Sequence, residues 1–414
     1  MFADRTAWDL RPNAFTRRRR ALEAAGVRLL DLTESNPTRC GFRYPDGWLD
    51  ALADPRAAVY EPSACGLVSA RAAVAEVYRS KGTIVDPGDV LLTASTSEAY
   101  SFLFRLLANP GDQILMPHPS YPLIEYLAGL ADVDAVPYRL VFEGRWLRQS
   151  EAAPLASARW RLDLESCRRA ITSRTRAIVI VHPHNPTGWA VTSEELAALA
   201  AHAAERRIPL IADEVFAEYL GPETLGPRTA LGAPDALVFA LGGVSKFLGL
   251  PQMKLAWIAM SGPPSARQQA RERLEVIADT FLSVATPVQW AWPRWLAEAA
   301  GIQEQIRQRV LANRRLLEQS VPGVLPASRG EWCGLRLPQP SSRGEGGWSA
   351  VIRVPHLDDE EAFVLKLLEQ DHVVVHPGYF FDFEEPGYLV VSLLPPPEMF
   401  AEAITRLGRL TTFL

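Results

Sequence analysis

The chain has 414 residues, of which 48% are hydrophobic and 22% are charged, a composition typical of a globular protein. Its length predicts two or three domains, and its net charge of -5 gives no reason to expect nucleic acid or an anionic membrane as a partner. The N-terminus has no apolar signal segment, and no apolar run approaches the ~20 residues that span a bilayer. The four cysteines are scattered, which suits a reducing cytoplasm and predicts no metal site.

Short apolar runs alternate with amphipathic stretches between residues 90 and 260. The runs predict buried strands, and the stretches 98–107 and 193–205 predict helices. This alternation indicates an α/β fold with a largely parallel sheet covered on both faces. The predicted strands are 90–93, 113–116, 177–182, 209–212, 236–241 and 255–260.

The pattern becomes helical and charged from about residue 265 to 320, and it predicts a long connecting helix. The rest of the chain predicts a smaller α+β domain with one helix at 358–370. A stretch rich in Pro, Ser and Gly at 339–347 predicts a loop. The strands expected in this domain are 331–337, 350–354, 372–375 and 389–394.

Polar clusters follow four of the predicted strands, at the edge where ligands collect on parallel sheets. Residues 93–99 place hydroxyl groups and free backbone N–H groups at the start of a helix, which suits an anion such as phosphate. Helix capping would account for one of these residues. In residues 182–188, two prolines and a glycine fix a turn that holds the amide of Asn185, although the turn by itself is ordinary.

The other two clusters carry a carboxylate and an amine. Asp213 follows a strand and would face a ligand bound at this edge of the sheet. If that ligand holds a pyridine nitrogen, the carboxylate could keep the nitrogen protonated. A role for Asp213 as a helix N-cap is an equally good interpretation. Lys246 follows an apolar strand and two glycines. Partial desolvation would lower the pKa of its amine and make it a nucleophile, but a single Ser-Lys pair is weak support.

In this order and at these separations, the four clusters resemble the fold-type I enzymes that use pyridoxal 5'-phosphate (PLP), in particular the class I and II aminotransferases. The resemblance runs from about residue 31 to the C-terminus. It implies a mainly parallel, seven-stranded sheet with helices on both faces in a large domain at 45–320. It also implies a small α+β domain at 321–414 and an N-terminal segment at 1–44 that joins the small domain and covers the active site.

The resemblance assigns roles residue by residue. Lys246 would form the internal aldimine with PLP and move a proton between substrate and cofactor. Asp213 would pair with the pyridine nitrogen, and Asn185 with the phenolic oxygen. Tyr121 is similar to the aromatic residue that stacks on the ring. Tyr60 is similar to the tyrosine that reaches the partner subunit's phosphate, which implies a homodimer with shared active sites. The phosphate would be held by Ser95, Thr96, Ser97, Ser245 and Lys254.

Three positions depart from the family. Phe216 stands where a tyrosine usually donates to the phenolic oxygen, and Lys254 stands where an arginine usually grips the phosphate. Val390 takes the place of the arginine that clamps the substrate α-carboxylate. Either the substrate lacks that carboxylate, or another cation holds it, and Arg39, just behind the loop of Asn36, is the leading candidate. Further candidates for the substrate pocket are Arg353, His376 and Tyr379.

The resemblance therefore implies an aminotransferase that moves an amino group from an amino acid or amine donor to a keto acceptor. A PLP-dependent lyase or synthase, acting by β-elimination or cyclisation, would share every cofactor residue, and Val390 keeps that alternative open. A PLP-binding module without catalysis is disfavoured by the intact Lys246 and Asp213. Donor, acceptor and pathway are not determined by the sequence.

Overall fold

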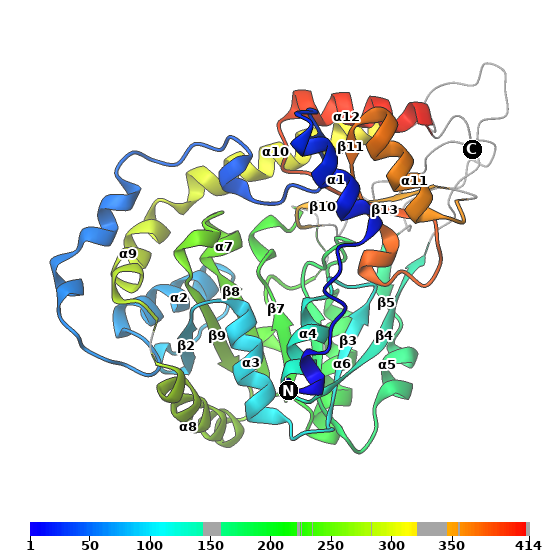
Figure 1. Cartoon of the computed structure of the whole chain (residues 1–414). Coiled ribbons are helices and arrows are strands. Elements are labelled where there is room, and N and C mark those ends of the chain that lie inside the picture. The colour runs from blue at the N-terminus through cyan, green and yellow to red at the C-terminus, as the bar shows by residue number, and fades with distance from the viewer. Residues whose placement is uncertain are drawn as a thin grey trace.

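A large sheet forms the centre of the molecule. The computed structural model describes residues 1–143, 159–221, 224, 226–233, 235–282, 284–320, 346–354 and 357–410. The sheet has eight strands in the order β2-β9-β8-β7-β6-β3-β4-β5 (Figure 1). The strands are β2 (Val90–Thr93), β3 (Gln113–His118), β4 (Asp134–Glu143), β5 (Arg159–Leu162), β6 (Thr175–Val181), β7 (Leu210–Asp213), β8 (Val238–Gly243) and β9 (Ala256–Ser261).

Strand direction brings the ends of distant strands together. Strands β4, β3, β6, β7 and β8 pair in parallel, while β9 is antiparallel to both of its neighbours, β8 and β2. Strand β2 therefore runs in the same direction as β8. The carboxyl ends of β2, β8, β7, β6 and β3 consequently lie at one edge of the sheet. The predicted α/β class with a mainly parallel sheet is confirmed.

Seven of these strands, from β2 to β4 in the sheet order, form the expected sheet, and β5 adds an eighth strand at its edge. Strand β4 is ten residues long and pairs with β3 only over residues 134–139. Its last four residues pair instead with β5, which runs antiparallel to them. A strand that extends beyond its neighbour leaves backbone N–H and C=O groups without partners, and β5 supplies those partners.

Helices cover both faces of the sheet, because successive strand residues point to opposite sides. In β6, Ala177 and Val179 face one core, whereas Ile178 and Ile180 face the other. The first core contains residues of α3, α4 and α8, and the second contains residues of α2, α5 and α6. These helices are α2 (Val68–Ser80), α3 (Thr96–Leu107), α4 (Leu123–Leu130), α5 (Leu164–Ala170), α6 (Ser193–Arg206) and α8 (Pro264–Phe281).

The predicted long connecting helix is wrong, because the segment forms three helices. Helix α8 ends before Leu282, whose φ of 70° is incompatible with a continuing right-handed helix. Helix α9 (Thr286–Ala297) then begins with Pro287 in its first turn, where a proline needs no hydrogen-bonded N–H. Helix α10 (Ala299–Ser320) follows. No described helix is both long and apolar enough to cross a membrane.

The C-terminal part forms two small sheets above the carboxyl edge of the large one (Figure 1). Strand β13 lies between β10 and β12 and is antiparallel to both, and β11 pairs in parallel with β1 from the N-terminal segment. Helix α1 packs against α11. The elements are α1 (Ala14–Ala24), β1 (Leu30–Asp31), β10 (Ser349–Arg353), α11 (Glu360–Lys366), β11 (Val373–Val374), β12 (His376–Pro377), β13 (Tyr388–Ser392) and α12 (Pro397–Leu410).

The parallel pairing of β1 with β11 supports the expectation that the N-terminal segment packs with the smaller domain. The boundaries at residues 44 and 320 stay predictions. The strand expected at 331–337 and most of the loop expected at 339–347 lie outside the described residues.

A buried carboxylate organises the loop between β12 and β13. Glu360, at the start of α11, is only 5% exposed. Its Oε2 accepts a hydrogen bond from the backbone N–H of Tyr379 at 3.0 Å, and its Oε1 accepts from those of Gly387 (2.6 Å) and Tyr388 (2.8 Å). One side chain thus holds both ends of the loop, including the candidate Tyr379.

We expect Glu360→Gln to lower the free energy of unfolding by about 1–3 kcal/mol, because the amide places a donor against a buried backbone donor. Urea denaturation would measure the loss. The neighbouring Glu361 is exposed, so Glu361→Gln is the matched control and should leave the midpoint unchanged. Equal stability of the two variants would contradict this role of Glu360.

Candidate active site

The predicted clusters come together at the carboxyl edge of the large sheet. Asp213 ends β7, and Lys246 lies in the short helix α7 (Val244–Phe247) that follows β8. Asn185 follows β6, Tyr121 follows β3, and Thr96 begins the helix after β2. The parallel directions of these strands place all five residues on the same edge.

The amine of Lys246 lies among aromatic rings. Its Nζ is 5.5 Å from the ring centre of Phe216 and 5.0 Å from that of Trp348. In the part of the chain that the structure describes, Nζ forms no hydrogen bond or ion pair. Its burial disfavours the charged form and lowers the pKa to about 8, although the charge of Asp213 acts in the opposite direction. The amine is therefore partly neutral at physiological pH.

The carboxylate of Asp213 is held by two donors. Its Oδ1 accepts from the backbone N–H of Val215 at 3.2 Å, and its Oδ2 accepts from the hydroxyl of Tyr100 at 3.1 Å. Burial raises the pKa of Asp213 to about 6, and both hydrogen bonds oppose this rise. No helix begins at Asp213, since the next helical turn is capped by Phe216, so the N-cap interpretation is wrong.

Tyr100 and Trp348 are site residues that the sequence did not reveal. Tyr100 lies on the inner face of α3 and is fully buried. The one indication of its role in the sequence is a hydroxyl group on an apolar helix face, because a buried hydroxyl group needs a hydrogen-bond partner. Trp348 lies just before β10, about a hundred positions from Lys246 in the chain, and no local pattern connects the two. It also packs against Tyr219, whose hydroxyl donates to the backbone oxygen of Lys246 at 2.9 Å.

The start of α3 has the features of an anion site. Ser95 caps the helix, because its hydroxyl accepts from the N–H of Glu98 at 3.1 Å. The carboxylate of Glu98 in turn accepts from the N–H of Ala94 at 2.7 Å. The hydroxyl groups of Thr96 and Ser97 have no hydrogen-bond partner among the described residues. These hydroxyl groups and the N–H groups of Thr96 and Ser97 are therefore available to an anion.

Two further phosphate candidates lie at the same edge. Ser245 follows β8 directly, next to Lys246. Lys254 precedes β9, which is antiparallel and therefore begins at this edge. Lys254 is exposed and has a φ of 51°. No described residue neutralises its ammonium group.

The amide of Asn185 is oriented by the C-terminal part of the chain. The hydroxyl of Ser349 donates to its Oδ1 at 3.2 Å, and its NH2 group, which has no partner among the described residues, can donate to a ligand. His182, in the same turn, is fully buried and contacts the N–H of Val191 (3.1 Å) and the oxygen of Pro227 (2.9 Å). Burial lowers its pKa to about 4, so His182 is neutral, and both of its ring nitrogens are engaged within the protein.

The position expected for a carboxylate clamp is apolar. Val390 packs in a buried cluster with Val351, Phe381 and Tyr388. Arg353, one of the candidate substitutes, lies 4.5 Å above the ring of Tyr388 and donates to the backbone oxygen of Pro386. Its guanidinium group is thus already engaged within the loop.

Arg39 remains available to a substrate. Its side chain is 75% exposed, and the one ion pair that it makes with a described residue is a long contact of 3.8 Å with Glu34. Asn36 caps the short helix Pro37–Arg39 by accepting from the N–H of Thr38. A Cβ on Gly249 would lie 3.0 Å from Pro37, so this segment packs closely on the loop that follows Lys246.

Tyr121 and Tyr60 are both exposed. Tyr121 is 51% exposed and lines a cleft of about 700 Å³ together with Trp8, Tyr126 and the candidate Tyr379. Tyr60 is 80% exposed. Its hydroxyl makes no hydrogen bond within the described chain. The structure therefore places Tyr60 on the surface and does not bring it to Lys246.

Comparison with known proteins gives concordant matches. Residues 35–407 match the family model described as aminotransferase class I and II. The chain is 29% identical to the glutamate-pyruvate aminotransferase AlaA of Haemophilus influenzae, over 94% of this chain and 92% of the relative. It is 32% identical to an alanine aminotransferase of Mycobacterium tuberculosis, over 94% and 86%. A solved alanine aminotransferase from Pyrococcus furiosus shares the fold, with a TM-score of 0.84, 24% identity and full coverage of both chains.

The Tyr100 hydroxyl should control the acidity of Asp213. Because this hydrogen bond favours the ionised carboxylate, we expect Tyr100→Phe to raise the pKa of Asp213 above about 6. The cost in stability should be roughly 1–3 kcal/mol above that pH and smaller below it, where Asp213 is protonated in both proteins. Carboxyl NMR and urea unfolding at several pH values would measure the two effects.

Tyr138→Phe is the matched control, since the buried Tyr138 hydroxyl donates to the backbone oxygen of Val179 at 2.7 Å. This variant should lose stability without changing the titration of Asp213. A pH-independent cost in Tyr100→Phe would show that the hydrogen bond does not act on the carboxylate.

Proposed function

The chain belongs to the class I and II aminotransferase family and is a PLP-dependent aminotransferase, and we propose that Lys246 is the residue that carries its chemistry. Its substrates are small amino and keto compounds. The observation that supports Lys246 most strongly is its shielded amine, with a pKa lowered to about 8, at the same sheet edge as the carboxylate of Asp213.

The residues at this edge fit PLP in number and in chemistry. Asp213 matches the ring nitrogen, and the free NH2 group of Asn185 matches the phenolic oxygen. The unpartnered hydroxyl groups of Thr96 and Ser97, with the N–H groups of the same two residues, match the phosphate. Ser245 and Lys254 add a hydroxyl group and a positive charge. When bound, PLP supplies the electron sink that stabilises the substrate after it loses a proton.

The chain's own groups then bind, orient and move protons. Nζ of Lys246 would serve as the base that takes the proton from Cα of the amino donor and, once protonated, as the acid that gives it back. Ionised Asp213, held by Tyr100 and Val215, would keep the ring nitrogen of PLP protonated. The rings of Phe216 and Trp348 exclude water from around Nζ, which keeps the amine partly neutral.

The donor is proposed to be a small amino acid. The relatives named alanine aminotransferase and glutamate-pyruvate aminotransferase support alanine with a 2-oxo acid as acceptor. The donor's carboxylate cannot be held at Val390, which lies in an apolar cluster. Arg39 is the proposed substitute, because its guanidinium group is exposed and its segment packs on the loop after Lys246.

The proposed assembly is a homodimer in which Tyr60 reaches the partner's phosphate. In support, Tyr60 is 80% exposed, and the nearby side chains of Leu49 and Val59 are each 63% exposed. Large apolar side chains exposed in the same stretch of chain are typical of an interface. A cytoplasmic location, expected from the scattered cysteines, stays a prediction.

Covalent attachment of PLP should depend on the neutral amine of Lys246. We expect the rate at which apoenzyme incorporates PLP, trapped by borohydride, to rise with pH around a midpoint of about 8. The negative charge of Asp213 raises the pKa of Lys246, so Asp213→Asn should move the midpoint to lower pH. Lys246→Ala should incorporate no PLP, whereas the distant Lys366→Ala should behave as wild type.

Peptide mapping would locate the attachment. Incorporation at another lysine, or a midpoint that Asp213→Asn leaves in place, would refute the assignment.

Arg39 should bind the donor without taking part in the chemistry. We expect Arg39→Ala to raise KM for the amino donor at least about tenfold, with a smaller change in kcat, because it removes a charge contact made before and during the reaction. Arg43→Ala, which removes another exposed arginine of the same segment, is the control. An unchanged KM in steady-state assays with alanine would exclude Arg39 as the carboxylate ligand.

A further inference from the structure

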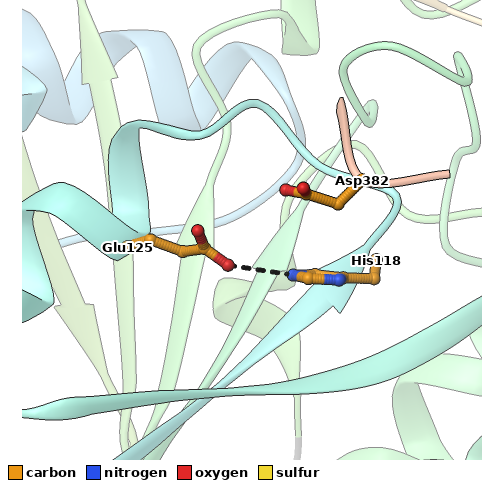
Figure 2. Close-up of side chains that lie close together, drawn as sticks. All are labelled: His118, Glu125 and Asp382. Atoms are coloured by element: carbon orange, nitrogen blue, oxygen red, sulfur yellow. Dashed lines mark ion pairs between the residues drawn. The ribbon is translucent and has the colours of Figure 1, made fainter. Parts of the chain in front are cut away.

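Three potential metal ligands converge beside the cleft that Tyr121 lines. His118 ends β3, Glu125 lies on α4, and Asp382 follows the short helix Gly378–Phe381. Figure 2 shows their side chains pointing toward one another from these three elements. One ligand atom from each residue lies within 4.8 Å of those of the other two.

The Nε2 atom of His118 faces this cluster without a hydrogen-bond partner among the described residues. The side chain of His118 is 17% exposed, and its Nε2 is buried. Oε1 of Glu125 lies 3.3 Å from this nitrogen. In a tetrahedral site with metal–ligand bonds of about 2.0–2.1 Å, two ligand atoms are separated by about 3.3 Å. The spacing therefore fits two ligands of one ion, and an ion would satisfy the buried nitrogen.

The backbone that carries His118 and Asp382 is held in place independently of any ion. The N–H of Ser120, two residues after His118, donates to the backbone oxygen of Phe381 at 2.8 Å. Glu360 fixes the loop from the other side through the N–H of Tyr379. Because the backbone on both sides of the cluster is fixed, little freedom remains to be lost when an ion binds.

We propose that His118, Glu125 and Asp382 bind one divalent transition-metal ion, best matched by zinc, with water in the fourth position. An imidazole nitrogen favours zinc-class ions over magnesium and calcium, and the two carboxylates neutralise the charge of the ion. The ion joins the end of β3 and α4 to the loop that carries Tyr379. This site was not expected from the sequence, and it does not depend on the roles proposed for Lys246 or Arg39.

The test is metal binding by the holoenzyme after dialysis against a chelator. Titration with Co²⁺, followed through the visible absorption of tetrahedral cobalt and by calorimetry, should show one ion per chain, displaced by Zn²⁺. His118→Gln and Asp382→Asn should each weaken binding at least about tenfold, as loss of a direct ligand costs no less than loss of a supporting residue. Zn²⁺ should also raise the Tm of the wild type but not that of Asp382→Asn.

Glu384→Gln is the matched control, because Glu384 lies two residues beyond Asp382 and pairs with Arg139 at 3.6 Å outside the cluster. It should bind Co²⁺ as the wild type does. An ion pair of His118 with the carboxylates, without any metal, would give no stoichiometric binding to the wild type and would overturn the proposal. Binding that Asp382→Asn leaves unchanged would overturn it as well. Asp382→Asn carries the test if His118→Gln does not fold.

Discussion

The site depends on an amine and a carboxylate that the fold keeps away from water on neighbouring strand ends. Burial lowers the pKa of Lys246 to about 8 and raises that of Asp213 to about 6, and the charge of Asp213 limits the fall at Lys246. Strands β7 and β8 are adjacent and parallel, with Asp213 opposite Leu241, so the two groups reach the same edge. The other residues of the site either contact Lys246 or Asp213 directly or lie beside them at this edge.

The support comes from elements distant in the chain. Tyr100 reaches Asp213 from α3, and Trp348 covers Lys246 from the segment before β10. Ser349, the next residue, orients the amide of Asn185. The C-terminal part therefore contacts two of the residues that are proposed to hold the cofactor. Precise placement of the reacting groups requires this second layer of contacts, which packing and hydrogen bonds hold in place.

The part of the site expected to bind the substrate carboxylate differs from the usual arrangement in the family, because Val390 replaces the arginine. Val390 belongs to an apolar cluster in which an arginine would be a buried, unpaired charge, and Arg353 is engaged at the rim of the same loop. Glu360 fixes both ends of this loop, and the loop carries Asp382, whose carboxylate lies near His118. Arg39, the proposed carboxylate ligand, lies instead in the N-terminal segment, where its side chain is exposed.

The sequence by itself determined the α/β class and most strands of the large sheet, and it predicted that Lys246, Asp213 and Asn185 meet at one edge of that sheet. These follow from local patterns: apolar runs set the strands, and polar residues directly after parallel strands meet at one edge. It could not show β5, the break at Leu282, Tyr100, Trp348 or the cluster of His118, Glu125 and Asp382. Those depend on contacts between residues far apart in the chain, and only the packing of the folded chain decides which of them meet.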